Sequence, residues 1–166
     1  MTFGTWKRWL LNGVIVLAIF FTVSTWQSRN LLSLKNQAPS FQLPAISGLN
    51  VKLNDFRGKR VLLYFFAPWC KVCELSISNL NWVKILRGEE NISLLAIALS
   101  YKDLQSIKSF VDRNNLEVPV LIGTPNITNS YQINAFPTIY VVNESGRIVS
   151  STVGYTSFLG LWWRTL

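Results

Sequence analysis

The chain has 166 residues, a length typical of one domain, and 49% of them are hydrophobic, which is enough to build a buried core. Its formal net charge of +8 would suit a nucleic acid, but the basic residues are scattered without a dense Lys/Arg tract, so we expect no nucleic acid partner. Two cysteines and no histidine are too few ligands for a structural zinc site, which needs about four, so no metal is predicted.

The N-terminal part of the chain predicts a membrane anchor. No charged residue occurs from Trp9 to Ser28, and about twenty helical residues span the hydrocarbon core of a bilayer. A cleaved signal peptide is the alternative, but residues 23–25 make a poor small-x-small cleavage site. We predict a cytoplasmic tail at 1–9, a transmembrane anchor at 10–28, a tether at 29–39 and one domain at 40–166.

The first half of the domain predicts a hairpin, a buried strand and a helix. Apolar alternation between residues 41 and 53, around Ser47-Gly48, is typical of a short hairpin. The continuous apolar run at 61–66 indicates a buried strand. Beyond it, helical spacing places Cys73, Ile77, Leu80 and Val83 on one side of a helix that Gly88 ends.

The second half continues the alternation of strands and helices. It predicts a strand at 92–99, a helix opened by a capping box at Ser100-x-x-Asp103, an apolar segment at 118–122, a short helix from Pro125, strands at 138–142 and 147–153, and a final helix at 157–166. Strands separated by helices imply a parallel portion, and the late hairpin adds antiparallel strands. We therefore predict an α/β fold with a mixed central sheet flanked by helices.

Cys70 and Cys73, the only cysteines of the chain, stand where the predicted strand passes into the predicted helix. A thiol at a helix N-terminus has its thiolate stabilised by unpaired backbone N–H groups and by the helix dipole. At positions i and i+3 of one turn, the two sulfurs can also join in a disulfide. The pair therefore indicates thiol–disulfide exchange, which needs no cofactor.

Two other roles for the cysteine pair stay open. A purely structural disulfide is conceivable, although a loop this short removes little chain entropy from the unfolded state. Copper(I) capture is the second alternative, because soft metals favour sulfur. Since the chain offers no histidine and only Met1 as an accessory soft ligand, we rank redox exchange first.

The motifs around the cysteines resemble those of the thioredoxin fold, and in particular the membrane-anchored disulfide oxidoreductases of the TlpA type. The matching pieces are the Phe-Ala-Pro-Trp-Cys-Lys-Val-Cys sequence at 66–73, Phe136-Pro137-Thr138, and a turn at Gly146 followed by Gly154. The resemblance covers about residues 38 to 160. Residues 154–157 are also similar to the suppressor-of-copper-sensitivity D-type subgroup.

This resemblance implies a role for each residue of the motif. Cys70 would be the attacking thiolate and Cys73 the resolving thiol. Pro137 would be a cis proline beside the disulfide, with the backbone of Phe136 pairing with the chain of the substrate. Trp69 would shape the surface around Cys70.

The chain departs from the family pattern at the positions of two acidic residues. Tyr64 stands where classical thioredoxins keep a buried carboxylate, and Ser76 stands where several membrane-anchored reductases have a glutamate. The base that deprotonates the resolving thiol is therefore not identifiable. Lys71 is expected either to stabilise the Cys70 thiolate or to remain a solvated lysine.

Together, the motif and the predicted anchor indicate a single-pass protein of a bacterial inner membrane, with its thioredoxin-like domain in the periplasm. We expect it to exchange disulfides with protein substrates, as a reductase recycled by a membrane electron donor. A protein thiol oxidase is the main alternative, because the redox poise depends on thiolate stability that sequence does not determine.

Overall fold

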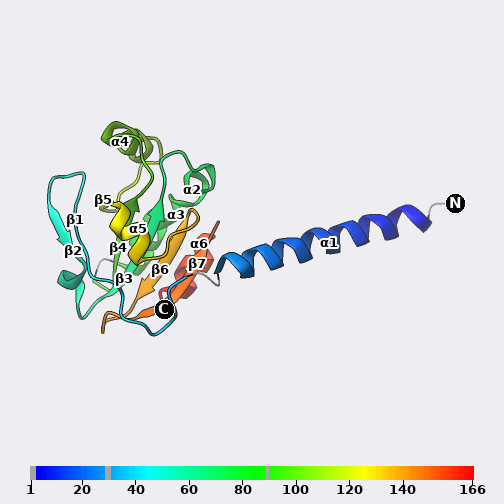
Figure 1. Cartoon of the computed structure of the whole chain (residues 1–166), viewed down its shortest axis with the longest axis horizontal. Helices are drawn as coiled ribbons and strands as arrows, with labels where there is room; N and C mark the ends of the chain where they lie inside the picture. The colour runs from blue at the N-terminus through cyan, green and yellow to red at the C-terminus, as the bar shows by residue number, and fades with distance from the viewer. Residues whose placement is uncertain (1–2, 29–30, 89) are drawn as a thin grey trace.

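The fold is a five-stranded mixed sheet with helices on both faces (Figure 1). The computed structural model describes residues 3–28, 31–88 and 90–166. In chain order the elements are α1 (Phe3–Ser28), β1 (Gln42–Pro44), β2 (Asn50–Lys52), a 3-10 turn (Leu53–Phe56), β3 (Arg60–Phe66), α2 (Lys71–Ser76), α3 (Asn79–Arg87), β4 (Ile92–Ala98), α4 (Leu104–Arg113), β5 (Val120–Ile122), α5 (Pro125–Ser130), β6 (Thr138–Val142), β7 (Ile148–Val153) and α6 (Phe158–Arg164).

The strands lie in the order β5-β4-β3-β6-β7. β3 pairs in parallel with β4, which pairs in parallel with β5, whereas β6 and β7 are antiparallel to their neighbours. This arrangement confirms the predicted thioredoxin-like α/β fold with its mixed sheet. The predicted hairpin is also present, as the antiparallel pair β1 and β2.

Strand β3 forms the centre of the molecule because both of its faces are buried. Successive side chains of a strand point to opposite faces. Leu62, Tyr64 and Phe66 accordingly enter the core cluster that includes residues of α3, α4 and α6. The alternate residues at 61, 63 and 65 enter a second cluster with α5 and the segment that leads into β1. The apolar run at 61–66 is thus a buried strand, as predicted.

Two helix boundaries differ from the sequence analysis. The helix predicted after the cysteines is split, since α2 ends at Ser76 and α3 starts at Asn79. The capping box expected at Ser100 is wrong, because Asp103 is the N-cap of α4. Its carboxylate accepts the N–H of Ser106 at 2.7 Å. Ser100 instead has a left-handed φ of 48°.

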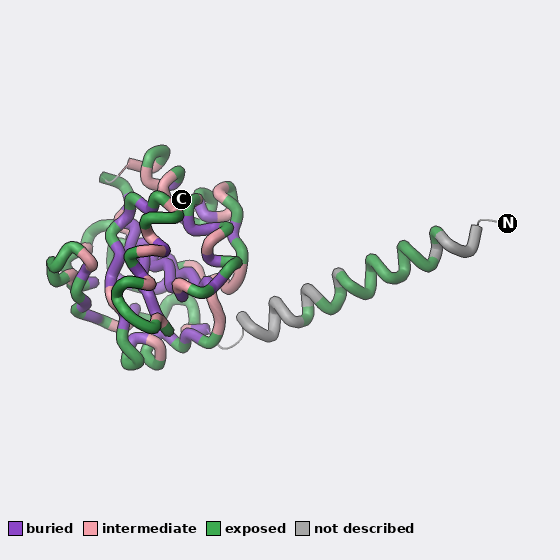
Figure 2. The backbone as a smooth tube through the Cα atoms, turned by 90° about the horizontal axis from the view of Figure 1, so that it is seen from above, coloured by how far each residue is buried: buried purple, intermediate pink, exposed green. Residues whose placement is uncertain are grey.

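The N-terminal helix α1 extends away from the globular part, and those of its side chains that are described are exposed (Figure 2). It contains residues 10–28, predicted as a transmembrane anchor, and most of the predicted tail. Within the described part of the chain, no helix combines the length and the apolar character needed to cross a membrane. The transmembrane anchor predicted at 10–28 stays a prediction.

The segment predicted as a tether packs against the domain over its described residues, 31–39. Leu31 and Ala38 are buried, and the N–H of Ala38 donates to the carbonyl of Gly146 at 2.9 Å. The N–H of Lys35 likewise donates to the carbonyl of Ile148 at 2.7 Å. Residues 31–39 therefore contact the domain, while residues 29–30 lie outside the described residues.

Candidate active site

The two cysteines occupy the junction between β3 and α2, as the sequence predicts. Cys70 is the N-cap of α2, with extended backbone, and its Sγ accepts the N–H of Cys73 at 3.1 Å. The four residues that follow β3 form a short turn in which the N–H of Cys70 donates to the carbonyl of Ala67 at 3.0 Å. The strand thus delivers the first cysteine to the start of the helix that carries the second.

The cysteines are joined in a disulfide whose two residues differ in exposure. Their Cα atoms are 5.2 Å apart, within the range that a disulfide can bridge. Cys70 keeps 8% of its surface exposed, whereas Cys73 is fully buried. An incoming thiolate can therefore reach Cys70, while Cys73 is shielded. This asymmetry matches the roles that the resemblance implies for the two residues.

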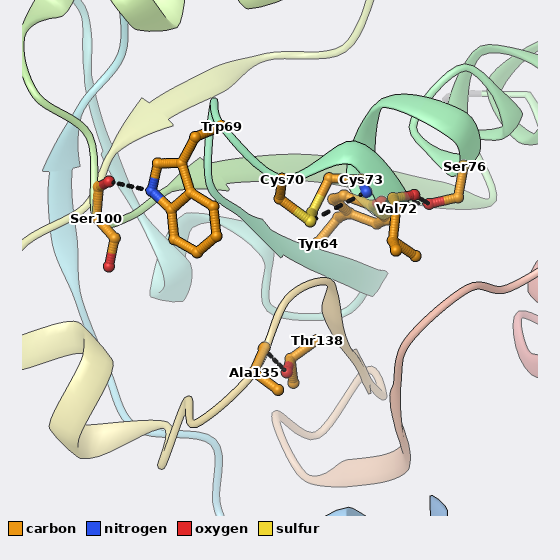
Figure 3. Close-up of a disulfide and its surroundings, with 9 residues drawn as sticks. All are labelled: Tyr64, Trp69, Cys70, Val72, Cys73, Ser76, Ser100, Ala135 and Thr138. Atoms are coloured by element: carbon orange, nitrogen blue, oxygen red, sulfur yellow. Dashed lines mark hydrogen bonds between the residues drawn. A yellow bond between two sulfur atoms is a disulfide. The ribbon is translucent and has the colours of Figure 1, made fainter. Parts of the chain in front are cut away.

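Trp69 forms an exposed aromatic surface next to Cys70. Its side chain is 67% exposed, and its indole N–H donates to the carbonyl of Ser100 at 2.8 Å. The indole lies between Ser100 and Cys70 (Figure 3). Its ring also contacts Phe136 edge to face, with centroids 5.9 Å apart. Sequence reasoning missed Ser100, because its carbonyl, not its side chain, makes the contact.

The peptide bond between Phe136 and Pro137 is cis, as the resemblance implies. Pro137 is buried directly before β6, and its carbonyl accepts the N–H of Gly154 at 2.8 Å. The hydroxyl of Thr138 donates to the carbonyl of Ala135 at 2.7 Å and closes the same loop. The structure therefore brings Phe136 to Trp69, although the two lie 67 positions apart. The pairing of the Phe136 backbone with a substrate stays a prediction.

Lys71 points into solvent and is paired with an acidic side chain. Its ammonium group, on a side chain that is 86% exposed, lies 2.7 Å from a carboxylate oxygen of Glu74. That hydrogen bond lowers the pKa of Glu74 below its ordinary value, and the guanidinium of Arg113, at 3.8 Å, adds a weaker contribution in the same direction. Because the charge of Lys71 is offset by Glu74, the tuning of the Cys70 thiolate by Lys71 stays a prediction.

Tyr64 and Ser76, the positions at which acidic residues are missing, form a buried hydrogen bond with each other. Their hydroxyl oxygens are 2.7 Å apart, and both side chains are almost completely buried next to the disulfide (Figure 3). The single proton of Ser76 is donated to the carbonyl of Val72 at 2.9 Å, so Tyr64 must be the donor to Ser76. Burial raises the pKa of Tyr64, which keeps it protonated.

A neutral chain of hydrogen bonds thus runs from Tyr64 through Ser76 to the carbonyl of Val72. The sequence showed each residue only as a departure from a pattern, since nothing in it indicates that positions 64 and 76 meet. These hydrogen bonds link the central strand to α2, the helix that carries Cys73. They supply no carboxylate that could accept a proton from that thiol.

The sequence was compared with models of known protein families. Residues 34–151 match the model of the AhpC/TSA family. The chain belongs to the AhpC/TSA family. Among curated proteins of this kind, it is 30% identical over 159 residues to the thioredoxin-like protein YneN of Bacillus subtilis, covering 89% of this chain and 91% of that one. It is 27% identical over 144 residues to the thiol-disulfide oxidoreductase ResA of Geobacillus kaustophilus, covering 85% and 82% respectively.

Solved structures show the same fold in other members of the thioredoxin-like group. A putative thiol:disulfide interchange protein DsbE from Chlorobium tepidum superposes with a TM-score of 0.74 at 24% identity, covering 80% of this chain and 95% of that one. StoA from Bacillus subtilis superposes with a TM-score of 0.69 at 21% identity, covering 78% and 98%. Together with the accessible Cys70 and buried Cys73, the family relationship establishes this AhpC/TSA protein as a thioredoxin-like thiol-disulfide oxidoreductase.

The hydrogen bond between Tyr64 and Ser76 can be measured by a double-mutant cycle. We expect Tyr64→Phe and Ser76→Ala each to lower the free energy of unfolding by about 1–3 kcal/mol, because each leaves a buried hydroxyl with one partner fewer. The double variant should lose less than the sum, with a coupling energy of about 0.5–1.5 kcal/mol in urea titrations. Strictly additive losses would contradict the hydrogen bond.

Proposed function

We propose that the protein reduces disulfide bonds of protein substrates outside the cytoplasm, using Cys70 and Cys73 as its dithiol. The observation that carries this proposal is the disulfide at the β3–α2 junction, in which Cys70 keeps a small exposed area and Cys73 is fully buried. Such a pair can open toward a partner at Cys70 and close again through Cys73. The exposed Trp69 and the partly buried Phe136 provide an apolar surface against which a polypeptide can lie.

The reaction transfers two electrons from the dithiol to the substrate. The thiolate of Cys70 attacks one sulfur of the substrate disulfide, forming a mixed disulfide and releasing the other sulfur as a thiolate that takes up a proton. The thiol of Cys73 then loses its proton, and its thiolate attacks the sulfur of Cys70. The second substrate sulfur leaves as a thiolate that takes up a proton, and the disulfide between Cys70 and Cys73 is formed.

The reducing direction requires a supply of electrons. A thiol donor at the membrane would reduce the disulfide again by the same exchange in reverse. The reducing role is supported by the resemblance to the TlpA type, to which we assign the chain, with the suppressor-of-copper-sensitivity D-type subgroup as the finer assignment. The opposite direction, oxidation of substrate dithiols, uses the same two sulfurs and differs only in the reduction potential.

We also propose that α1 attaches the domain to a bacterial inner membrane, with the domain in the periplasm. The uncharged stretch from Trp9 to Ser28 supports this location, as does an active-site disulfide, which suits an oxidising compartment. The apolar side chains described on α1, such as Leu11 and Val14, are exposed and belong to neither core cluster of the described residues, so they are free to contact lipid.

Membrane attachment predicts how the full chain fractionates. In a bacterial host, we expect the chain to stay in the membrane pellet after extraction at alkaline pH, because α1 would be held by apolar contacts that pH does not weaken. A variant in which a cleavable export signal replaces residues 1–28 should be found in the soluble periplasmic fraction. Release of the full chain by alkaline extraction would contradict the attachment.

The assignment of roles to the cysteines predicts which variant captures substrates. Cys73→Ser should accumulate mixed disulfides with substrate proteins through Cys70, because the resolving thiol is missing. Non-reducing gels and mass spectrometry of the adducts would measure this capture and identify the substrates. Cys70→Ser is the matched control and should capture far less, since Cys73 is buried. Equal capture by the two variants would contradict the assigned roles.

The direction of the reaction predicts the reduction potential of the pair. For a reductase we expect a value closer to the about −270 mV of thioredoxin than to the about −120 mV of the oxidant DsbA. Equilibration of the purified chain with glutathione buffers or dithiothreitol, followed by thiol alkylation, gives the potential directly. A value near the oxidising end would show that the protein is a thiol oxidase instead.

A further inference from the structure

A groove of about 450 Å³ opens beside the redox site, at the carboxyl ends of β4 and β5. One wall consists of residues 99–101, which follow β4. The other consists of Gly123 and Thr124 after β5, together with Thr128 and Asn129 of α5. This volume is within the range of ligand sites and is large enough for one or two amino-acid side chains.

The groove is built on the same edge of the sheet as the cysteines. β3, β4 and β5 are parallel neighbours, so the segments that leave their carboxyl ends lie side by side. Backbone hydrogen bonds hold these ends in register: the N–H of Leu99 donates to Phe66 at 2.8 Å, and that of Gly123 donates to Ala98 at 2.9 Å. The cysteine turn starts directly after Phe66.

Trp69 joins the groove to the disulfide. Its indole N–H donates a hydrogen bond to the carbonyl of Ser100, a residue of the groove wall. The ring lies between Ser100 and Cys70 (Figure 3). The left-handed φ of Ser100, 48°, is uncommon for a residue with a side chain. A polypeptide that reaches Cys70 can therefore continue across the exposed indole into the groove.

The wall of the groove at Gly123 has no space for a side chain. A Cβ atom at Gly123 would lie 2.5 Å from a methyl group of Leu99 and 2.8 Å from the carbonyl oxygen of Ala98. The hydroxyl of Tyr101 donates to the carbonyl of Gly123 at 3.2 Å and ties the two walls together. The groove is thus a defined shape formed by both walls.

The side chains that line the groove carry no charge. They present hydroxyl groups at Ser100, Tyr101, Thr124 and Thr128, the amide of Asn129, and apolar surface at Leu99 and Pro125. A charged group would lose hydration there without meeting an opposite charge, whereas a neutral side chain can be accepted at little cost. The chemistry of the lining therefore selects against charge.

We propose that this groove binds the segment next to the reacting cysteine of a protein substrate, and that it accepts an uncharged side chain of that segment. The inference rests on the proposed action on protein disulfides and adds the class of sequence that the site prefers. Because the groove continues from Trp69 and Cys70, the polypeptide that reacts at Cys70 is the ligand that we assign to it.

The test compares two tryptophan substitutions on the same short helix. Asn129→Trp places a large ring in the groove, whereas Asn126→Trp places the same ring on an exposed position of α5 outside it. The substrates are 2-hydroxyethyl disulfide and a cysteine peptide dimerised through a disulfide, with threonine two residues on either side of the cysteine. The measured quantity is the ratio of kcat/KM for the peptide to that for the small disulfide, using the full-length chain with dithiothreitol as the electron source.

We expect Asn129→Trp to lower this ratio about tenfold and Asn126→Trp to leave it at the wild-type value. A second peptide, with lysine in place of threonine, should react about tenfold more slowly with the wild-type chain, and this discrimination should disappear in Asn129→Trp. Equal ratios for the two variants, or no preference of the wild-type chain for the threonine peptide, would overturn the proposal that the groove binds the substrate. A wild-type chain that reduces the small disulfide but neither peptide would instead refute the proposed action on proteins, and the groove proposal with it.

Discussion

The position of β3 between β4 and β6 is the constraint on which the rest of the structure depends. Its parallel pairing with β4 places the cysteine turn beside the turn at Ser100, and its antiparallel pairing with β6 places the same turn beside the cis proline. Phe65 faces Thr138 in the register, so the residues that leave β3 meet those that enter β6. Two segments that are far apart in the sequence thereby become neighbours, and both faces of β3 must be apolar, because each is covered by a core cluster.

This arrangement explains how one disulfide can be both protected and reactive. Cys73 lies inside the core cluster that α3, α4 and α6 help to build, whereas Cys70, at the edge of that cluster, keeps a small exposed area. Trp69 is held by a backbone carbonyl and by the ring of Phe136, so the surface beside the reactive sulfur is prearranged. Below the disulfide, Tyr64 and Ser76 form a neutral hydrogen-bonded pair. Neither of these two side chains is a carboxylate that could accept a proton from the Cys73 thiol.

The fold was predictable to the extent that local patterns specify it. The apolar run of β3, the hairpin of β1 and β2 and the strands β6 and β7 were all expected within a residue or two, because burial on one or both faces of a strand is visible as periodicity. The end of α2 and the cap of α4 were not, since both depend on which side chain reaches which backbone group. Ser100 and Asp103 are each acceptable N-caps, and only the path of the chain after β4 decides between them. The segment from Leu31 to residue 39 was expected to be a tether because it lacks periodicity, yet it packs through backbone hydrogen bonds that any sequence can make.

By itself, the sequence identified the reactive group: two cysteines at a strand-to-helix junction, with only Met1 as a further soft ligand, favour disulfide exchange over copper capture or a purely structural disulfide. It also supplied the motif residues Trp69 and Pro137, which the family resemblance places at the site. Only the tertiary structure decided that Cys70 is the accessible sulfur, that Tyr64 and Ser76 bond to each other, and that an uncharged groove continues from Trp69. These properties arise from contacts between segments on different strands, and the strength of such contacts depends on burial and geometry, which no local pattern of residues records.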